Sequence, residues 1–163
     1  MLNIAHRGAS AYKPENTLAS FQKAIDLNAD MVEFDIRLSK DKKIVVIHDQ
    51  TVNRTTDGRG KVQNKDLEQL KLLNAGGGEL IGGRCLINIE IAERGIAKRL
   101  AEALQPFYYM WDSIVISSFS FKELKIFYYY MPTLKVSYLS EELTVRSIKE
   151  ISQLPIYSLN LNK

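Results

Sequence analysis

The sequence predicts an α/β fold whose sheet is parallel. Short apolar runs recur along the chain, and amphipathic helical patterns of roughly ten residues separate most of them. Strands that alternate with helices at this spacing form parallel sheets. Polar or charged residues lie at or near the ends of four runs, at His6, Asp35, Glu90 and Ser117, as at the carboxyl rim of a (β/α) barrel, where such enzymes keep their catalytic groups. Six candidate barrel strands are recognisable, and a closed barrel needs about eight.

The composition predicts one globular domain over residues 1–163, with 45% hydrophobic and 25% charged residues. The net charge of +3 is mild and the basic residues are scattered, which argues against a nucleic-acid partner. No apolar run approaches the roughly 20 residues of a membrane span, and the first residues do not resemble a signal peptide, so we expect a cytoplasmic protein. The single cysteine, Cys85, precludes an internal disulfide and is expected to pack as a small hydrophobe.

The first predicted strand, 2–5, ends in His6-Arg7-Gly8. The glycine lets the backbone turn at the strand end. The histidine there would supply an imidazole that carries protons, and the arginine a guanidinium group that binds phosphate. An amphipathic helix follows from Leu18, with Asn16 or Thr17 as its N-cap. Glu15 is either a favourable charge at this helix start or a side chain that points into a site.

The stretch Met31–Asp49 predicts a β-hairpin. Apolar residues alternate with Glu33, Asp35 and Arg37, which places two carboxylates on one side of the first strand. The short turn after it makes the second run, 44–48, antiparallel and returns His48 opposite position 33 or 34. Two carboxylates and an imidazole then converge, as a divalent metal site with an acid/base group requires. The alternative is a hairpin whose polar face simply meets water.

The remaining elements continue the alternation of strands and helices. Residues 50–61 form a polar loop, and Gly76-Gly77-Gly78 is expected to be a flexible connector rather than a phosphate-binding loop. Glu90 lies on a strand otherwise suited to burial, so its carboxylate should be paired, protonated or bound to a metal. Helices are predicted at 66–73, 96–107, 121–130 and 141–151, the last capped by Ser140 or Thr144, and strands at 86–91, 114–117, 134–138 and 156–161.

Several motifs together resemble the glycerophosphodiester phosphodiesterases. They agree with that family in order and spacing across nearly the whole chain: His6-Arg7-Gly8, Pro14-Glu15-Asn16-Thr17, Glu33-Phe34-Asp35, His48-Asp49, Arg54-Thr55-Thr56, Asn88-Ile89-Glu90-Ile91 and Ser117-Ser118-Phe119. The resemblance implies a TIM (β/α)8-type barrel with a segment inserted after the second strand.

The resemblance also implies a set of roles. A divalent cation, Ca²⁺ or Mg²⁺, would be held by Glu33, Asp35 and Glu90, with Glu15 as a further carboxylate close by. His6 and His48 would act as general acid and base, and Arg7 would bind the phosphate. The implied substrate is a small glycerophosphodiester, cleaved to an alcohol and glycerol 3-phosphate.

The chain departs from the family pattern in two ways. Ala92 stands where the family usually has a lysine, two residues after the third metal carboxylate. Part of the inserted segment and the last two barrel strands are also missing, which leaves two explanations. Either stretches of a longer protein are missing from the sequence, so that residues far apart in that protein are adjacent here near 83–85 and 91–93, or the chain is a shortened family member. The first is favoured because an open barrel exposes its apolar interior.

Two other functions compete with the leading one. The chain could be a lysophospholipase D-like enzyme that cleaves lipid phosphodiesters. It could also be an inactive barrel remnant that binds phosphorylated ligands or a partner protein, a hypothesis that Ala92 favours and the two retained histidines oppose. Aromatic residues such as Tyr128–Tyr130 are compatible with an oligomer.

Overall fold

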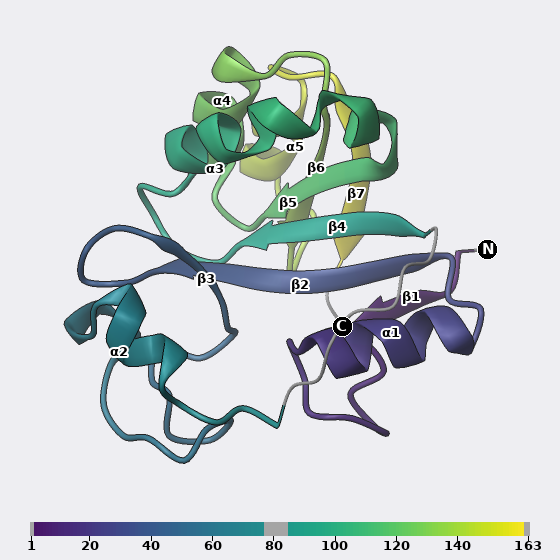
Figure 1. The fold of residues 1–163 in the computed structure, drawn as a ribbon. Coiled ribbons are helices and arrows are strands. Elements are labelled where there is room, and N and C mark those ends of the chain that lie inside the picture. Colours follow the sequence, from purple (N-terminus) through teal and green to yellow (C-terminus); the bar gives the residue numbers. More distant parts are fainter. Residues whose placement is uncertain (1, 77–84, 162–163) are drawn as a thin grey trace. The chain divides into compact units, whose positions relative to one another are not determined.

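A computed structural model describes residues 2–76 and 85–161 (Figure 1). The chain divides into two compact units, Met1–Ile87 and Asn88–Lys163. Two of the three glycines of the predicted connector, Gly77 and Gly78, lie outside the described residues. None of the helices in the described ranges has the length and apolar composition needed to cross a bilayer.

The first unit is built on a pair of parallel strands. β1 runs parallel to β2 with His6 level with Glu33, and β3 pairs antiparallel with β2. The predicted hairpin is therefore confirmed. Residues 36, 37 and 38 of β2 pair with residues 46, 45 and 44 of β3. The elements of this unit are β1 (Ile4–His6), α1 (Leu18–Asp26), β2 (Met31–Leu38), β3 (Ile44–Val46), the 3₁₀ helix η1 (Val62–Asn64) and α2 (Leu67–Lys71).

The hairpin register determines where His48 lies. Ile36 pairs with Val46, so the same register continued by two residues puts His48 level with Phe34, one of the two predicted positions. β3 itself ends at Val46, but the Ile47 N–H still donates to the Asp35 carbonyl at 3.1 Å. The Arg37 Nε donates to the His48 carbonyl at 2.6 Å. These backbone links hold His48 beside the carboxylate-bearing strand.

Helix α1 is tied to the end of β1 through its first turn. Thr17 is its N-cap, as the sequence allowed, and forms a capping box with Ser20. The Ser20 hydroxyl also donates to the Arg7 carbonyl at 3.0 Å, and the Ser20 carbonyl accepts the Ala9 N–H at 2.9 Å. Gly8 lies against this turn with φ of +80°. The start of α1 and the His6-Arg7-Gly8 turn are thus packed and hydrogen-bonded to each other.

In the second unit, strands alternate with helices along the chain. Its strands lie in the order β4-β5-β6-β7, and both the β5–β6 and the β6–β7 pairs are parallel. The elements are β4 (Leu86–Ile91, which begins in the first unit), α3 (Ala97–Leu104), η2 (Gln105–Ser113), β5 (Ile114–Ser118), α4 (Phe121–Tyr130), β6 (Lys135–Ser140), α5 (Val145–Ile151) and β7 (Ile156–Leu161). All six predicted barrel strands are present, and the chain has the order and parallel pairing of a TIM-type barrel.

The core of the second unit holds α4 against its strands, and a buried carboxylate of α4 caps the start of α3. Phe127 and Leu124 of α4 are fully buried, as is Ile116 of β5. The buried Glu123 accepts the N–H groups of Gly95 and Ala97, each at 3.0 Å, and so caps the start of α3 with a carboxylate from a neighbouring helix.

Three helices are shorter than predicted. The helix expected over 66–73 covers only Leu67–Lys71. The helix expected over 96–107 ends at Leu104, and a 3₁₀ segment follows in which Phe107 leaves helical geometry after Pro106. The helix expected over 141–151 begins only at Val145, because Thr144 caps it through the Ser147 N–H.

We expect Gly8→Ala to destabilise the protein by about 2 kcal/mol or more. A side chain at this position would be strained by the positive φ, and its Cβ would lie 2.7 Å from the Ser20 carbonyl carbon. Chemical denaturation measures the loss. Gly95→Ala is the matched control, because Gly95 has a similar φ of +86° but no atom within 4 Å of an added Cβ. Equal losses in the two variants would contradict the packing argument.

Candidate active site

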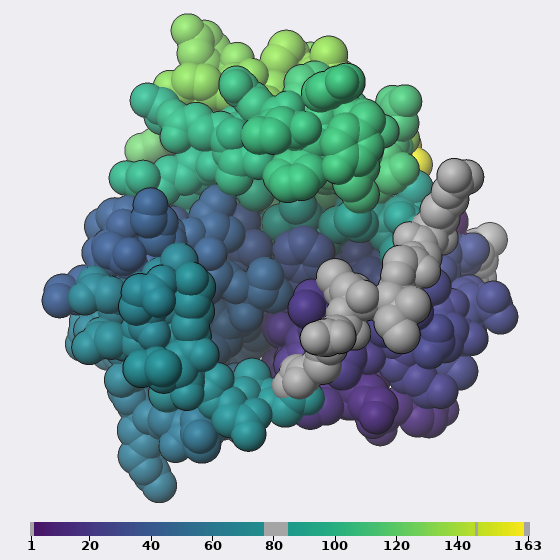
Figure 2. All heavy atoms as spheres, viewed as in Figure 1, coloured from purple at the N-terminus to yellow at the C-terminus, as the bar shows by residue number. Residues whose placement is uncertain are grey.

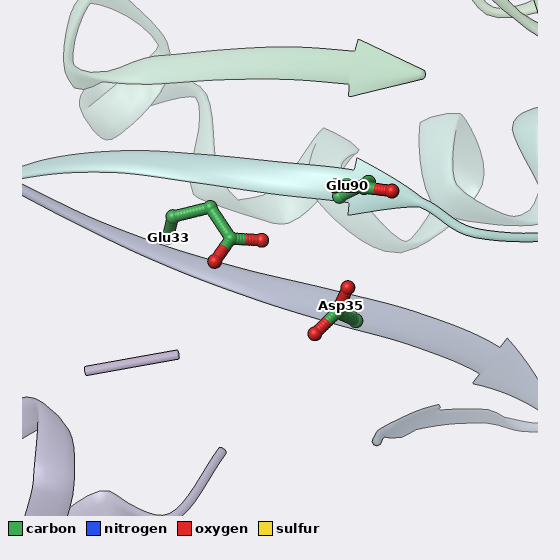
Figure 3. A group of neighbouring side chains, drawn as sticks. All are labelled: Glu33, Asp35 and Glu90. Atoms are coloured by element: carbon green, nitrogen blue, oxygen red, sulfur yellow. The ribbon is translucent and has the colours of Figure 1, made fainter. Parts of the chain in front are cut away.

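Strand β2 carries two carboxylates on one face. Figure 3 shows Glu33 and Asp35 projecting from the same side of the strand, and both are buried, with 5% and 1% of their surface exposed. The Arg7 N–H donates to Glu33 Oε2 at 2.9 Å, and the Asn16 Nδ2 donates to Asp35 Oδ2 at 3.0 Å. The Arg7 Nε lies 3.5 Å from the same Asp35 oxygen. Buried carboxylates require such donors and positive charges, because desolvation otherwise disfavours the ionised form.

His6 lies at the end of β1, directly beside this face. Its Nε2 lies 3.8 Å from Glu33 Oε2, and its side chain is 67% exposed. Partial burial lowers the pKa of His6, the positive charge of Arg7 adds to this effect, and the charges of Asp35 and Glu15 oppose it. The imidazole is thus accessible and lies among charged groups.

Glu15 lies between two guanidinium groups. Its Oε1 accepts from Arg7 Nη1 at 3.1 Å, and its two oxygens accept from Arg54 Nη1 and Nη2 at 2.6 and 2.8 Å. The hydrogen bond from Arg54 is the largest of the causes that lower the pKa of Glu15. Glu15 thus points toward Arg7 and Arg54.

His48 is held by the carboxylate that follows it. Its Nδ1 lies 2.8 Å from Asp49 Oδ1, and Asp49 in turn accepts from Arg54 Nε and Nη2 at 2.8 and 2.9 Å. These bonds hold the pKa of Asp49 well below its usual range, so the group is ionised and can only accept. The Nδ1 of His48 is then the donor of this hydrogen bond.

Together these contacts form a continuous charge chain, Arg7–Glu15–Arg54–Asp49, that ends on His48. It connects the turn after β1 with the loop after β3. The sequence reasoning assigned no site role to Asp49 or Arg54, and it considered Asn16 only as a helix cap. The position of Asp49 next to His48, and of Arg54 in a polar loop after a charged strand, were the available signals.

Two further residues were singled out in the sequence, Cys85 and Glu90. Cys85 is half-buried, and burial raises the pKa of its thiol, which fits a packing role. Glu90 is the penultimate residue of β4 and is half-buried (Figure 3). Ala92 follows two residues later, just after the strand ends.

Acid should weaken the charge chain. The pKa values of Glu15 and Asp49 lie below their ordinary values of 4.5 and 3.8. A carboxyl whose pKa is lower in the folded than in the unfolded state adds stability above the unfolded pKa, and this stability is lost as the pH falls. We therefore expect the denaturation midpoint to drop as the pH is lowered below about 4.5, and to drop less in Arg54→Gln.

The control for this prediction is Arg59→Gln, which changes an exposed arginine of the same loop. It should follow the wild-type pH curve. Parallel pH curves for Arg54→Gln and wild type would mean that Arg54 does not lower the two pKa values.

Comparison with known proteins identifies relatives that include glycerophosphodiester phosphodiesterases. Residues 6–85 match the Glycerophosphoryl diester phosphodiesterase family. The glycerophosphodiester phosphodiesterase of Caldanaerobacter subterraneus subsp. tengcongensis is 40% identical over 161 aligned residues, which cover 85% of this chain and 66% of the relative. In Bacillus subtilis, YhdW is 58% identical over 76 residues but only 31% of it is covered. The chain thus spans less than two thirds of these relatives.

Solved structures give the same result. The glycerophosphodiester phosphodiesterase of Thermotoga maritima is 32% identical, with a TM-score of 0.78 over 98% of this chain and 73% of that one. A phosphodiesterase of Oleispira antarctica, solved in complex with the product sn-glycerol-3-phosphate, is 27% identical, with a TM-score of 0.80 over 96% of this chain and 72% of that one. By sequence and by structure, the chain belongs to the glycerophosphodiester phosphodiesterase family.

Proposed function

We propose that the protein hydrolyses glycerophosphodiesters to an alcohol and glycerol 3-phosphate. The observation that carries the proposal is the pair of histidines. His6 lies 3.8 Å from Glu33 on the carboxylate face of β2, and His48 ends the charge chain that begins at Arg7. Membership of the family supports it, as does the glycerol 3-phosphate bound to the Oleispira relative.

In this proposal the two histidines divide the proton transfers. One takes the proton from the attacking oxygen, which is either water or the neighbouring glycerol hydroxyl of the substrate, and the other gives a proton to the departing alcohol. The hydrogen bond to Asp49 orients His48 for this task. Arg7 binds the phosphate through its guanidinium group, whose Nε faces Asp35 at 3.5 Å and whose Nη1 donates to Glu15.

The proposal includes a divalent cation, Ca²⁺ or Mg²⁺, held by Glu33, Asp35 and Glu90. When bound, such an ion offsets negative charge that develops on the phosphoryl oxygens. The donor set fits a hard cation, since it offers only oxygen atoms. The buried Oδ1 of Asn16, beside Asp35, has no hydrogen-bond partner within the described residues and is a further oxygen of the same kind.

The inclusion of Glu90 rests on its place in its own strand. It is the one carboxylate of β4 and lies next to the strand's carboxyl end, where barrel enzymes keep their catalytic groups. A carboxylate on a strand otherwise suited to burial should be paired or bound to a metal.

Ala92 bears on the rate rather than on the type of reaction. A lysine at this position would place a second cation near the phosphate, and its loss weakens the neutralisation of substrate charge. The inactive-remnant hypothesis gains from Ala92, but a remnant would have no need of the ionised Asp49 that orients His48.

The direct test is an assay of the purified chain with glycerophosphocholine. We expect choline release in the presence of Ca²⁺ or Mg²⁺ and its loss on addition of EDTA, because the carboxylates alone cannot offset the phosphoryl charge. His6→Ala and His48→Ala should each lower kcat by about 10² to 10⁴-fold.

Circular dichroism of the histidine variants provides the control, because both side chains are at least partly exposed and their removal should leave the fold intact. A histidine variant with wild-type turnover would remove that residue from the mechanism. No release of choline under any metal condition would favour the remnant hypothesis.

Metal binding can be tested without turnover. Calorimetric titration with Ca²⁺ or Mg²⁺ should show stoichiometric binding that weakens at least tenfold in Glu33→Gln and in Glu90→Gln, because each loses a charged oxygen ligand. Glu68→Gln is the control, since Glu68 is an exposed carboxylate of α2 paired with Lys71. Equal affinities in Glu90→Gln and wild type would exclude Glu90 from the site.

A further inference from the structure

A cavity of about 280 Å³ lies within the first unit, next to the candidate active site. Most of its wall is apolar and comes from β3, from the loop after it and from α2, with Val46, Val52, Val62, Leu67, Leu70 and Leu73 among the lining residues. Thr55, Thr56 and Lys71 are the polar residues of the same segments that line it. In Figure 2 the segment around α2 (teal) lies at the surface beside the segment that follows β3 (blue). None of these apolar residues takes part in the charge chain.

Three residues of the candidate active site also line this cavity. They are Glu15, Asn16 and His48. A molecule that reacts beside His48 can therefore extend into the apolar space without leaving the site. The cavity is thus placed to take one of the two groups attached to the phosphate.

The chemistry of the wall decides which group this is. Glycerol carries hydroxyls that would lose their hydrogen bonds to water against valine and leucine side chains, and burying them unpaired is costly. An alkyl group gains from the same wall, at about 25 cal/mol for each Å² of apolar surface removed from water. The apolar cavity therefore suits the alcohol part of the diester and not the glycerol part.

The size of the cavity limits the alkyl group. Small-molecule sites usually measure about 300–1,000 Å³, so 280 Å³ is at the lower end of this range. It holds a short chain but not the long acyl or alkyl chain of a lysophospholipid.

We propose that this cavity is the subsite for the departing alcohol, and that the protein prefers glycerophosphodiesters of short, uncharged alkyl alcohols. The proposal rests on the hydrolytic function proposed above and specifies its substrate class. It disfavours the lysophospholipase D-like alternative, which needs space for a lipid chain.

The test compares three diesters of glycerol 3-phosphate, with methanol, 1-butanol and 1-dodecanol. The butyl diester should have a kcat/KM at least tenfold above the methyl diester, through a lower KM, because its extra methylenes become buried. The dodecyl diester should show no gain over the butyl one. Equal values for methyl and butyl diesters would overturn the proposal, and a further tenfold gain for dodecyl would assign the cavity to a lipid chain instead.

Leu70→Trp should fill the cavity and reduce the butyl-to-methyl ratio of kcat/KM about tenfold. Val46→Trp, on β3, provides a second filling variant if Leu70→Trp does not fold. Leu72→Trp is the matched control, because Leu72 is 85% exposed, lies beside α2 and does not line the cavity. A ratio that falls equally in the control, or in neither filling variant, would contradict the proposal.

A binding measurement separates this proposal from the hydrolytic one. If no diester is cleaved, the hydrolytic function fails, but n-butyl phosphate should still bind at least tenfold more tightly than methyl phosphate in calorimetry. Leu70→Trp or Val46→Trp should abolish that difference. No difference in wild type would overturn the subsite as well.

Discussion

The interaction on which the candidate site depends is the double pairing of Arg54, with Glu15 on one side and Asp49 on the other. Planar guanidinium groups suit such two-point bonding of carboxylates, and hydrogen bonds between charged partners are among the stronger ones in proteins. The pairing ties the segment before α1 to the loop after β3. Without it, Glu15 would keep only Arg7, and Asp49 would keep only the ring of His48 that it orients.

The two histidines differ in how they are held. His48 has a carboxylate at Nδ1 and an arginine on its backbone carbonyl, so both the ring and the main chain are fixed. His6 is more exposed and lies 3.8 Å from Glu33, too far for a hydrogen bond. Its position comes from the end of β1 rather than from a side-chain partner. Sites that use one acid and one base commonly separate the roles by such a difference in surroundings.

Local sequence patterns predicted most of the secondary structure, because each depends on neighbouring residues. Alternation along β2 gave the hairpin and the level of His48, and helical spacing gave α4 with its observed bounds. The pairing of Arg54 with Glu15 joins residues 39 apart, so no periodicity reveals it. The 3₁₀ segment after Leu104 was missed because apolar spacing continues through it, while Pro106 and the backbone of Phe107 end the regular helix.

The backbone of the first unit also carries strain where the carboxylates are buried. Arg7 and Asn16 have φ angles of +58° and +57°, and a left-handed residue other than glycine costs about 1–2 kcal/mol. Hydrogen bonds to carboxylates stabilise both residues in this conformation: Arg7 donates to Glu33 and Glu15, and Asn16 donates to Asp35. Glu33 and Asp35 are both buried on β2, and buried carboxylates need hydrogen-bond donors and positive charge beside them. Arg7 and Asn16 supply these from the two strained positions.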